Sequence, residues 1–180
     1  MKIVITGAGG FVGKKLTRFF RARHQVLALT RHSLDITDGH AVRRMITEAG
    51  PDLIINCVVS GVDACEANPS MASAVNVVGP QYLAEAAAEI DAEILHFSTN
   101  YVFDGKREAG SFYTNRDAPL PINKYGETKL AGELAVLTAA PKSYTVHARL
   151  PERTHSMNSR RRLRLGKSHS DGRRGFHLFL

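Results

Sequence analysis

Tyr125 and Lys129 are the residues whose types and spacing best permit catalysis. They stand four positions apart in Tyr-Gly-Glu-Thr-Lys, a spacing that places both side chains on one face of a helix. A tyrosine with a pKa of about 10 exchanges protons poorly at neutral pH, whereas a neighbouring ammonium favours the phenolate and lowers that pKa. The pair therefore predicts a tyrosine that protonates a carbonyl oxygen while Lys129 lowers its pKa.

Ser98 and Thr99 supply hydroxyl groups at the end of an apolar run, residues 93–99, that predicts a strand. A hydroxyl at the carboxyl end of a parallel strand can hydrogen-bond a substrate carbonyl and orient it. Simple capping of the strand end is the alternative. Of the two residues, Thr99 is favoured as the catalytic one.

A glycine-rich turn follows the first apolar run, with glycines at three-residue intervals. Such a turn brings backbone N–H groups close to a pyrophosphate, and the last glycine allows the following helix to pack closely. The N-terminus of that helix then faces the anion. The residues predicted to bind a dinucleotide cofactor here are Gly7, Gly10, Phe11, Val12 and Gly13.

The cofactor's ribose is expected at the end of a second strand, where an acid suits a 2′-hydroxyl and a base suits a 2′-phosphate. Arg31 stands there, which favours NADP (NADPH) and leaves NAD as the alternative. The alternative is that Arg31 is an ordinary solvent-exposed arginine with no part in cofactor binding. Asp35 and Ile36 are expected to border the adenine, although an aspartate in this loop can equally cap a helix.

Alternating strands and helices position these residues. Near-continuous apolar strands separated by helical spacing predict a doubly wound parallel sheet, a Rossmann-like α/β fold. The expected strands are 2–6, 25–30, 52–58, 93–99 and 144–149, and the expected helices begin near Val12, end near Gly50, cover 69–89 and contain Tyr125. A loop is expected over 104–121.

The charge of the chain is concentrated at its C-terminus. Residues 149–180 carry a net charge of +7, equal to that of the whole chain, so residues 1–148 sum to zero. We therefore expect an NAD(P)-binding domain over 1–149. Residues 150–180 are expected to be a basic tail that is disordered or read out of frame. Without aromatic interleaving, this tail is a poor candidate for nucleic-acid binding.

Cysteine and histidine usage gives little sign of a metal or a disulfide. Cys57 and Cys65 lack zinc-ligand spacing, and no metal is assigned. A disulfide framework is not expected either, so a reducing cytoplasm is the default. No run approaches the roughly 20 apolar residues of a membrane span. His96 and His147 lie within expected strands and are interpreted as packing residues.

Four blocks of residues resemble the extended short-chain dehydrogenases/reductases, and most closely the dTDP-4-dehydrorhamnose reductase family. The blocks are Thr6-Gly7-Ala8-Gly9-Gly10-Phe11-Val12-Gly13, Pro51-Asp52-Leu53-Ile54-Ile55-Asn56-Cys57 with Val62-Asp63-x-Cys65-Glu66, Ser98-Thr99-Asn100-Tyr101-Val102-Phe103-Asp104-Gly105, and Tyr125-Gly126-Glu127-Thr128-Lys129-Leu130-Ala131-Gly132-Glu133.

The resemblance implies NAD(P)H-dependent reduction of a nucleotide-linked 4-keto-6-deoxy sugar in dTDP-rhamnose biosynthesis. It implies that Thr99 binds the keto oxygen, that Tyr125 donates the proton, and that Lys129 holds the nicotinamide ribose. Asn76 matches a helix asparagine near the family's active site. The backbone at Cys57, Val58 and Val59 is implied to border the cofactor.

Two departures from the family pattern stand out. Asn100 replaces the family's usual aspartate, and the Trp-containing block and substrate half expected after the last strand are not found. We therefore expect a truncated reductase with impaired turnover. The strand at 144–149 would be a sheet edge, where unpaired backbone groups favour pairing with a second copy as a homodimer.

A second hypothesis keeps the cofactor fold without catalysis. Non-catalytic regulatory subunits of methionine adenosyltransferase are similar in the cofactor fold and in a block like the one that begins at Ser98. In that case the chain would bind NADP and a protein partner.

Overall fold

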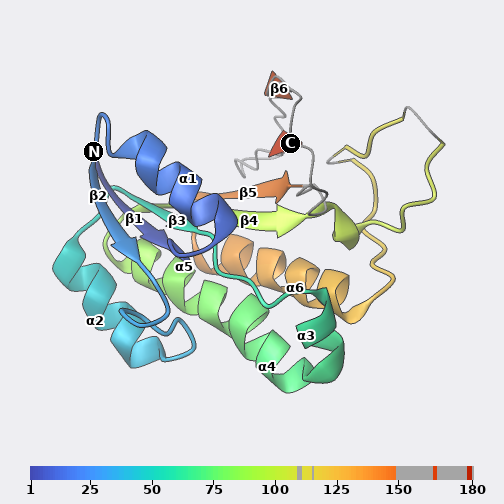
Figure 1. Cartoon of the computed structure of the whole chain (residues 1–180), viewed down its shortest axis with the longest axis horizontal. Helices are drawn as coiled ribbons and strands as arrows, with labels where there is room; N and C mark the ends of the chain where they lie inside the picture. Colours follow the sequence, from blue (N-terminus) through green and yellow to red (C-terminus); the bar gives the residue numbers. More distant parts are fainter. Residues whose placement is uncertain (109–110, 115, 149–163, 166–177, 180) are drawn as a thin grey trace.

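A five-stranded parallel sheet forms the centre of the protein (Figure 1). The computed structural model of the chain describes residues 1–108, 111–114, 116–148, 164–165 and 178–179. The strand order is β2-β1-β3-β4-β5, with every neighbouring pair parallel. The strands are β1 (Lys2–Thr6), β2 (Gln25–Leu29), β3 (Leu53–Asn56), β4 (Glu93–Thr99) and β5 (Ser143–Ala148). The predicted doubly wound α/β fold is confirmed.

Helices cover the two faces of this sheet unequally (Figure 1). On one face lies α1 (Phe11–Phe20), whose Leu16 and Phe20 pack against Ile3 and Ile5. On the other face lie α2 (Gly39–Ala49), α5 (Gly79–Glu89) and α6 (Lys124–Ala139), which enclose the larger core around β1, β3 and β4. Two short helices, α3 (Val62–Ala67) and α4 (Pro69–Ser73), precede α5. Sequence periodicity did not predict α3.

Strand β3 ends earlier than its apolar run predicts. Residues 52–58 were expected to form a strand, but pairing stops at Asn56. The side-chain oxygen of Asn56 accepts the Val58 N–H at 3.0 Å, so a side chain takes the place of a neighbouring strand as acceptor. The chain therefore leaves the sheet at the carboxyl ends of the strands, where ligands bind in folds of this kind.

The helical segment predicted over 69–89 is present, with a π-helical segment, η1 (Ala74–Val78), at its centre. Pro80 has no N–H to donate to the Asn76 carbonyl, while the Gly79 N–H bonds to Ala74 O. The Asn76 carbonyl instead faces α6 at Gly132, where an added Cβ would overlap its oxygen. A glycine is therefore required for α6 to approach η1 this closely.

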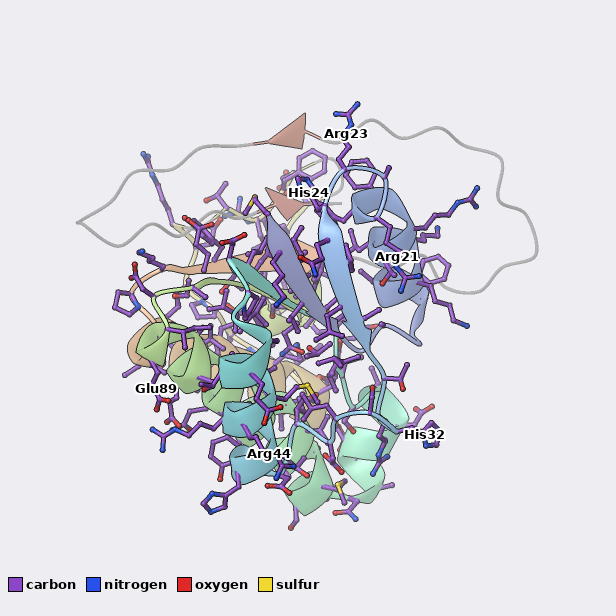
Figure 2. All side chains as sticks on the ribbon, turned by 90° about the vertical axis from the view of Figure 1, so that its left-hand side faces the viewer. Arg21, Arg23, His24, His32, Arg44 and Glu89 are labelled. Atoms are coloured by element: carbon purple, nitrogen blue, oxygen red, sulfur yellow. The ribbon has the colours of Figure 1, made fainter. Side chains whose placement is uncertain are left out.

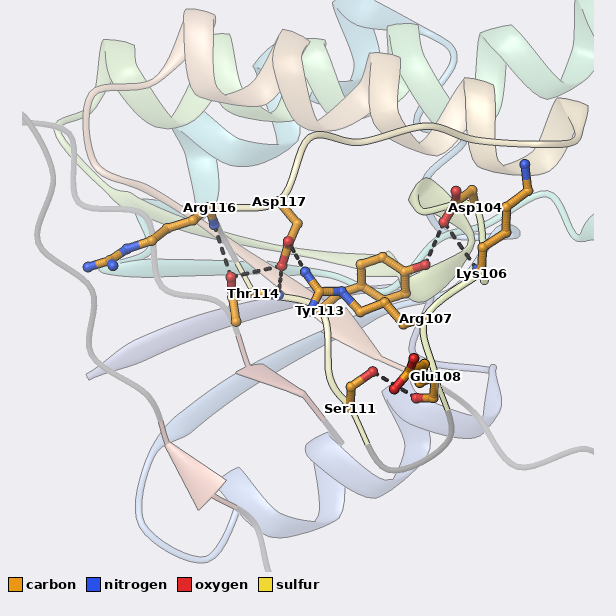
Figure 3. Close-up of polar contacts among 9 residues, drawn as sticks. All are labelled: Asp104, Lys106, Arg107, Glu108, Ser111, Tyr113, Thr114, Arg116 and Asp117. Atoms are coloured by element: carbon orange, nitrogen blue, oxygen red, sulfur yellow. Dashed lines mark hydrogen bonds and ion pairs between the residues drawn. The ribbon is translucent and has the colours of Figure 1, made fainter.

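The loop predicted between β4 and α6 begins with a 3₁₀ turn, η2 (Asn100–Val102), and is tied to itself by side chains (Figure 3). The Tyr113 hydroxyl donates to Asp104 Oδ1 at 2.5 Å, and the Tyr113 ring stacks on Phe103 with centroids 4.4 Å apart. Arg107 forms an ion pair with Asp117. These contacts fix the path by which the chain returns to the start of α6.

Most of the tail predicted at 150–180 lies outside the described residues, so its disorder stays a prediction. Two described pieces of it, β6 (Arg164–Leu165) and β7 (Leu178–Phe179), pair antiparallel. Within the five-stranded sheet β5 is an edge strand, as expected. None of the helices in the described ranges combines the length and apolar character that a bilayer span needs.

Candidate active site

The glycine turn joins β1 to α1 at the carboxyl end of the sheet. Gly7 has φ +69°, and a Cβ there would lie 2.7 Å from the Cys57 carbonyl carbon. A Cβ at Gly13 would overlap Gly7 O, so this glycine lets the helix pack against the turn. Gly10 is the N-cap of α1 and places no side chain over the helix end. The first N–H groups of the helix, including those of Phe11 and Val12, are thereby left available to an anion.

The loop after β2 contains the residues expected at the ribose (Figure 2, where His32 marks this loop and His24 marks the opposite end of β2). Arg31 is exposed. Asp35 accepts hydrogen bonds from the Thr37 N–H and hydroxyl, and these bonds, with a smaller contribution from Arg31, lower the pKa of Asp35. The Asp35 carboxylate therefore stabilises the turn in which it lies.

The helix-capping role considered for this loop belongs to Asp38, whose side chain accepts the Ala41 N–H. Ile36 is buried in the larger core and packs against Gly79. Only the backbone of Ile36 is thus placed to border a cofactor, and its predicted role stays a prediction.

The segment after β3 runs beside the glycine turn. Cys57 and Val58 are half-buried, and Val59 is exposed. Burial raises the pKa of the Cys57 thiol to about 12, so this cysteine stays protonated at neutral pH. That state fits its packing against the smaller apolar cluster.

Thr99 and Tyr125 meet where β4 ends and α6 begins. The Thr99 side chain acts on the Tyr125 hydroxyl and tends to lower its pKa, and Thr99 Oγ1 accepts the Tyr101 N–H at 3.2 Å. Burial nevertheless raises the pKa of Tyr125, an effect larger than the opposing effect of Thr99. The structure therefore brings together two of the three residues predicted to be catalytic.

Lys129, the third residue, is almost completely buried, with 1% of its surface exposed. Its Nζ donates to Phe97 O at 2.7 Å and lies 3.1 Å from His96 Nε2. Burial lowers the pKa of Lys129 to about 8. The prediction that Lys129 lowers the pKa of Tyr125 is wrong for this conformation, because that pKa is raised and Lys129 is not among its causes.

Asn76 links the loop after β3 to α6. It is fully buried, and its amide bonds both backbone groups of Ser60 and the Thr128 hydroxyl. Because the amide is engaged in these contacts, Asn76 supports the helix that carries Tyr125 and Lys129.

Two buried histidines, indicated by the sequence only as packing residues, have polar partners beside this site. His96 lies between Asn56 and Lys129, and His147 Nε2 is 2.9 Å from Glu133 Oε1. Ser98 also donates to Glu133 and so is directed away from Thr99. The signal in the sequence is a polar residue within each of two apolar strands, Asn56 and His96, and the register of β3 and β4 then pairs the two.

Comparison with known proteins agrees with this geometry. The family described as the RmlD substrate binding domain matches residues 1–150. The chain belongs to this family. It is 50% identical over 147 residues to the dTDP-4-dehydrorhamnose reductase of Mycolicibacterium smegmatis, covering 81% of this chain and 44% of that protein. The predicted resemblance is confirmed.

Solved structures support the same membership. A dTDP-4-dehydrorhamnose reductase from Clostridium acetobutylicum matches with a TM-score of 0.79 and 38% identity, over 83% of this chain and 53% of that one. The Bacillus anthracis reductase, solved in complex with NADP, matches with a TM-score of 0.78 and 33% identity, over 82% and 52%. The chain thus spans about half the length of these RmlD-family relatives.

Proposed function

We propose that this chain supplies the cofactor-binding and proton-donating half of an NADPH-dependent reductase acting on a dTDP-linked 4-keto-6-deoxy sugar. The observation that carries the proposal is the proximity of Thr99 and Tyr125 at the carboxyl edge of the sheet, together with a glycine turn that leaves the N-terminus of α1 without a side-chain cap. Its relatives include dTDP-4-dehydrorhamnose reductases, one of which is solved in complex with NADP.

Each residue has a distinct part in the proposed reaction. When bound, the nicotinamide supplies the hydride that reduces the keto carbon. Thr99 hydrogen-bonds the keto oxygen, and Tyr125 donates its hydroxyl proton to that oxygen, giving the alcohol. The raised pKa keeps Tyr125 protonated at neutral pH, which is the form that a proton donor needs, although it also makes the phenol a weaker acid. Lys129 would contact the nicotinamide ribose.

The residues around the turn suit the dinucleotide. Gly10 leaves the N-terminus of α1 open to the pyrophosphate, and exposed Arg31 suits a 2′-phosphate. NADPH is therefore favoured over NADH.

A titration with NADPH, followed by cofactor fluorescence with NADH alongside, tests the cofactor site. We expect saturable binding of NADPH and a loss of about tenfold in its affinity in Arg31→Ala, with NADH unaffected. Gly10→Asp should abolish binding, because a carboxylate would stand at the anion site. The matched control is Gly61→Asp, the same change at the exposed N-cap of α3, where nothing lies within 4 Å. Equal binding by Gly10→Asp and the unchanged chain would refute the cofactor site.

Reduction of a dTDP-4-keto-6-deoxy sugar, followed by loss of NADPH absorbance, tests the chemistry. We expect slow turnover, and Tyr125→Phe should lower it by about a hundredfold or more. Reduction of the sugar would reject the non-catalytic regulatory alternative, and copurification of a protein partner would favour it.

The setting of the protein is a further part of the proposal. Cys57 and Cys65 are free thiols, which favours a reducing compartment such as the cytoplasm. The edge position of β5 favours pairing with a second copy. Sedimentation at several concentrations would test the homodimer.

A further inference from the structure

A row of buried polar side chains crosses the centre of the sheet. Thr6, Asn56 and His96 are register partners on β1, β3 and β4. At most 1% of each is exposed. Hydrogen bonds join them in sequence and end at Lys129 on α6. Buried polar groups are costly unless they are bonded, so such a row calls for a reason.

The orientation of the Asn56 amide is fixed by its neighbours. Its oxygen accepts the Val58 N–H at 3.0 Å and the Thr6 hydroxyl at 2.8 Å. A backbone N–H can only donate, so the atom facing it must be the oxygen. The amide nitrogen of Asn56 therefore faces His96 Nδ1, at 3.0 Å.

That orientation dictates the tautomer of His96. Nδ1 must accept from the Asn56 amide, so a neutral His96 carries its proton on Nε2. Nε2 lies 3.1 Å from Lys129 Nζ. An ammonium there would set one donor against another, whereas a neutral amine has a lone pair to accept the Nε2–H and can still donate to Phe97 O.

We propose that Asn56 and His96 are positioning residues that disfavour the ammonium form of Lys129 relative to its neutral amine, by holding an N–H donor against its nitrogen. This proposal rests on the proposed function in one respect, namely that Lys129 takes part in that function. The two residues act through Lys129 and have no direct contact with substrate in the proposal.

The surroundings of Lys129 agree with this assignment. Burial lowers the pKa of Lys129 to about 8, so the neutral amine becomes the major form only above that pH. Burial also lowers the pKa of His96 well below its ordinary value, so His96 stays neutral near pH 7. The other titratable groups that act on Lys129 or His96, or share their helix face, are Glu133, Cys57, Cys65, His147 and Tyr125. Glu133 favours the ammonium, and burial outweighs it.

Nitrogen NMR of the intact chain, labelled with ¹⁵N-histidine and free of cofactor, tests the proposal directly. The tautomer is read from the shifts of Nδ1 and Nε2, and the His96 signal is identified by its loss in His96→Gln. We expect the Nε2–H form at neutral pH. An Nδ1–H form or an imidazolium at His96 would overturn the proposal, whether or not the chain binds NADPH.

Asn56→Asp gives a sharper test. The isosteric carboxylate accepts from Nδ1–H, turns Nε2 into an acceptor and so favours the Lys129 ammonium. Carbon NMR of labelled lysine should show the pKa of Lys129 rising by about one unit or more. Thr6→Val is the matched control, because Val58 still fixes the amide, and it should leave the His96 tautomer unchanged. An unchanged Lys129 pKa in folded Asn56→Asp, or an equal shift in Thr6→Val, would refute the proposal. If Asn56→Asp does not fold, the tautomer in the unmodified chain still decides.

Discussion

The two faces of the sheet differ in both packing and chemistry. Among the described residues, sixteen buried apolar residues form the cluster under α2, α5 and α6, and four form the cluster under α1. The polar row from Thr6 to Lys129 lies on the better-packed face. A dense surround holds polar groups dry and fixes their geometry. The chemistry of the site thus depends on the core beside it, and substitutions on the two faces should differ in effect.

Gly132→Ala should give the largest effect. Its Cβ would overlap the Asn76 carbonyl oxygen, and neither backbone can move freely because both lie in helices. We expect a loss of more than about 4 kcal/mol in the free energy of unfolding, measured by urea denaturation. Gly61→Ala, at a site with nothing within 4 Å, is the control. A cost below about 1 kcal/mol for Gly132→Ala would mean that the contact between α6 and η1 is looser than described.

Ile94→Ala and Leu95→Ala compare the faces directly. These neighbours on β4 point to opposite faces, Ile94 fully buried in the larger cluster and Leu95 half-buried beside the smaller one. We expect Ile94→Ala to cost about 3 kcal/mol and Leu95→Ala about half as much, because less surface is buried and solvent can fill the space. Equal costs in denaturant unfolding would contradict the comparison.

Lys129→Met should change how stability depends on pH. The pKa of Lys129 falls from 10.5 to about 8 on folding. Below about pH 8 both states are protonated and the cost of the buried charge is fully present. It is relieved as the pH rises from about 8 to 10.5, because the folded chain releases its proton first. The difference in unfolding free energy between variant and unmodified chain should therefore change by about 3 kcal/mol across this window. If the curves of unfolding free energy against pH are parallel for the variant and the unmodified chain, Lys129 keeps an ordinary pKa.

Asp38→Ala should have the smallest effect of the four. It removes the side-chain cap of α2, whose oxygen accepts the Ala41 N–H at 3.0 Å. We expect a loss of about 1 kcal/mol in thermal or urea unfolding. Asp38→Asn, which retains a capping oxygen, should recover most of it. An equal loss in both variants would assign the effect to charge.

The sequence predicted the fold well because hydrophobic periodicity reports directly on parallel strands and covering helices. The strands were misplaced only at their ends, as at Val58, where a side-chain hydrogen bond ends the ladder. Thr99 and Tyr125 were brought together as expected. The pKa of Tyr125 was predicted in the wrong direction, because spacing on a helix says nothing of how deeply each side chain is buried.

His96 was missed for a related reason. Alternation along one strand shows which face a residue occupies, but its partners belong to neighbouring strands and depend on register. Asn56 and His96 are 40 positions apart and meet only because β3 and β4 pair as they do. Lys129 likewise contacts His96 and Phe97 of β4, and the residue pattern of α6 alone does not indicate which strand its side chain contacts.

The close approach of α6 to the π-helical turn at Asn76 has a consequence for how the molecule opens. At Gly132 the backbone of α6 packs directly against the Asn76 carbonyl of η1, so neither segment can unfold locally without breaking its packing with the other. The amide hydrogens of η1 and α6 should therefore exchange with solvent as one cooperative unit, more slowly than those of α1. Tyr125, the proposed proton donor, would then lie on a part of the protein that opens only when most of the rest has unfolded.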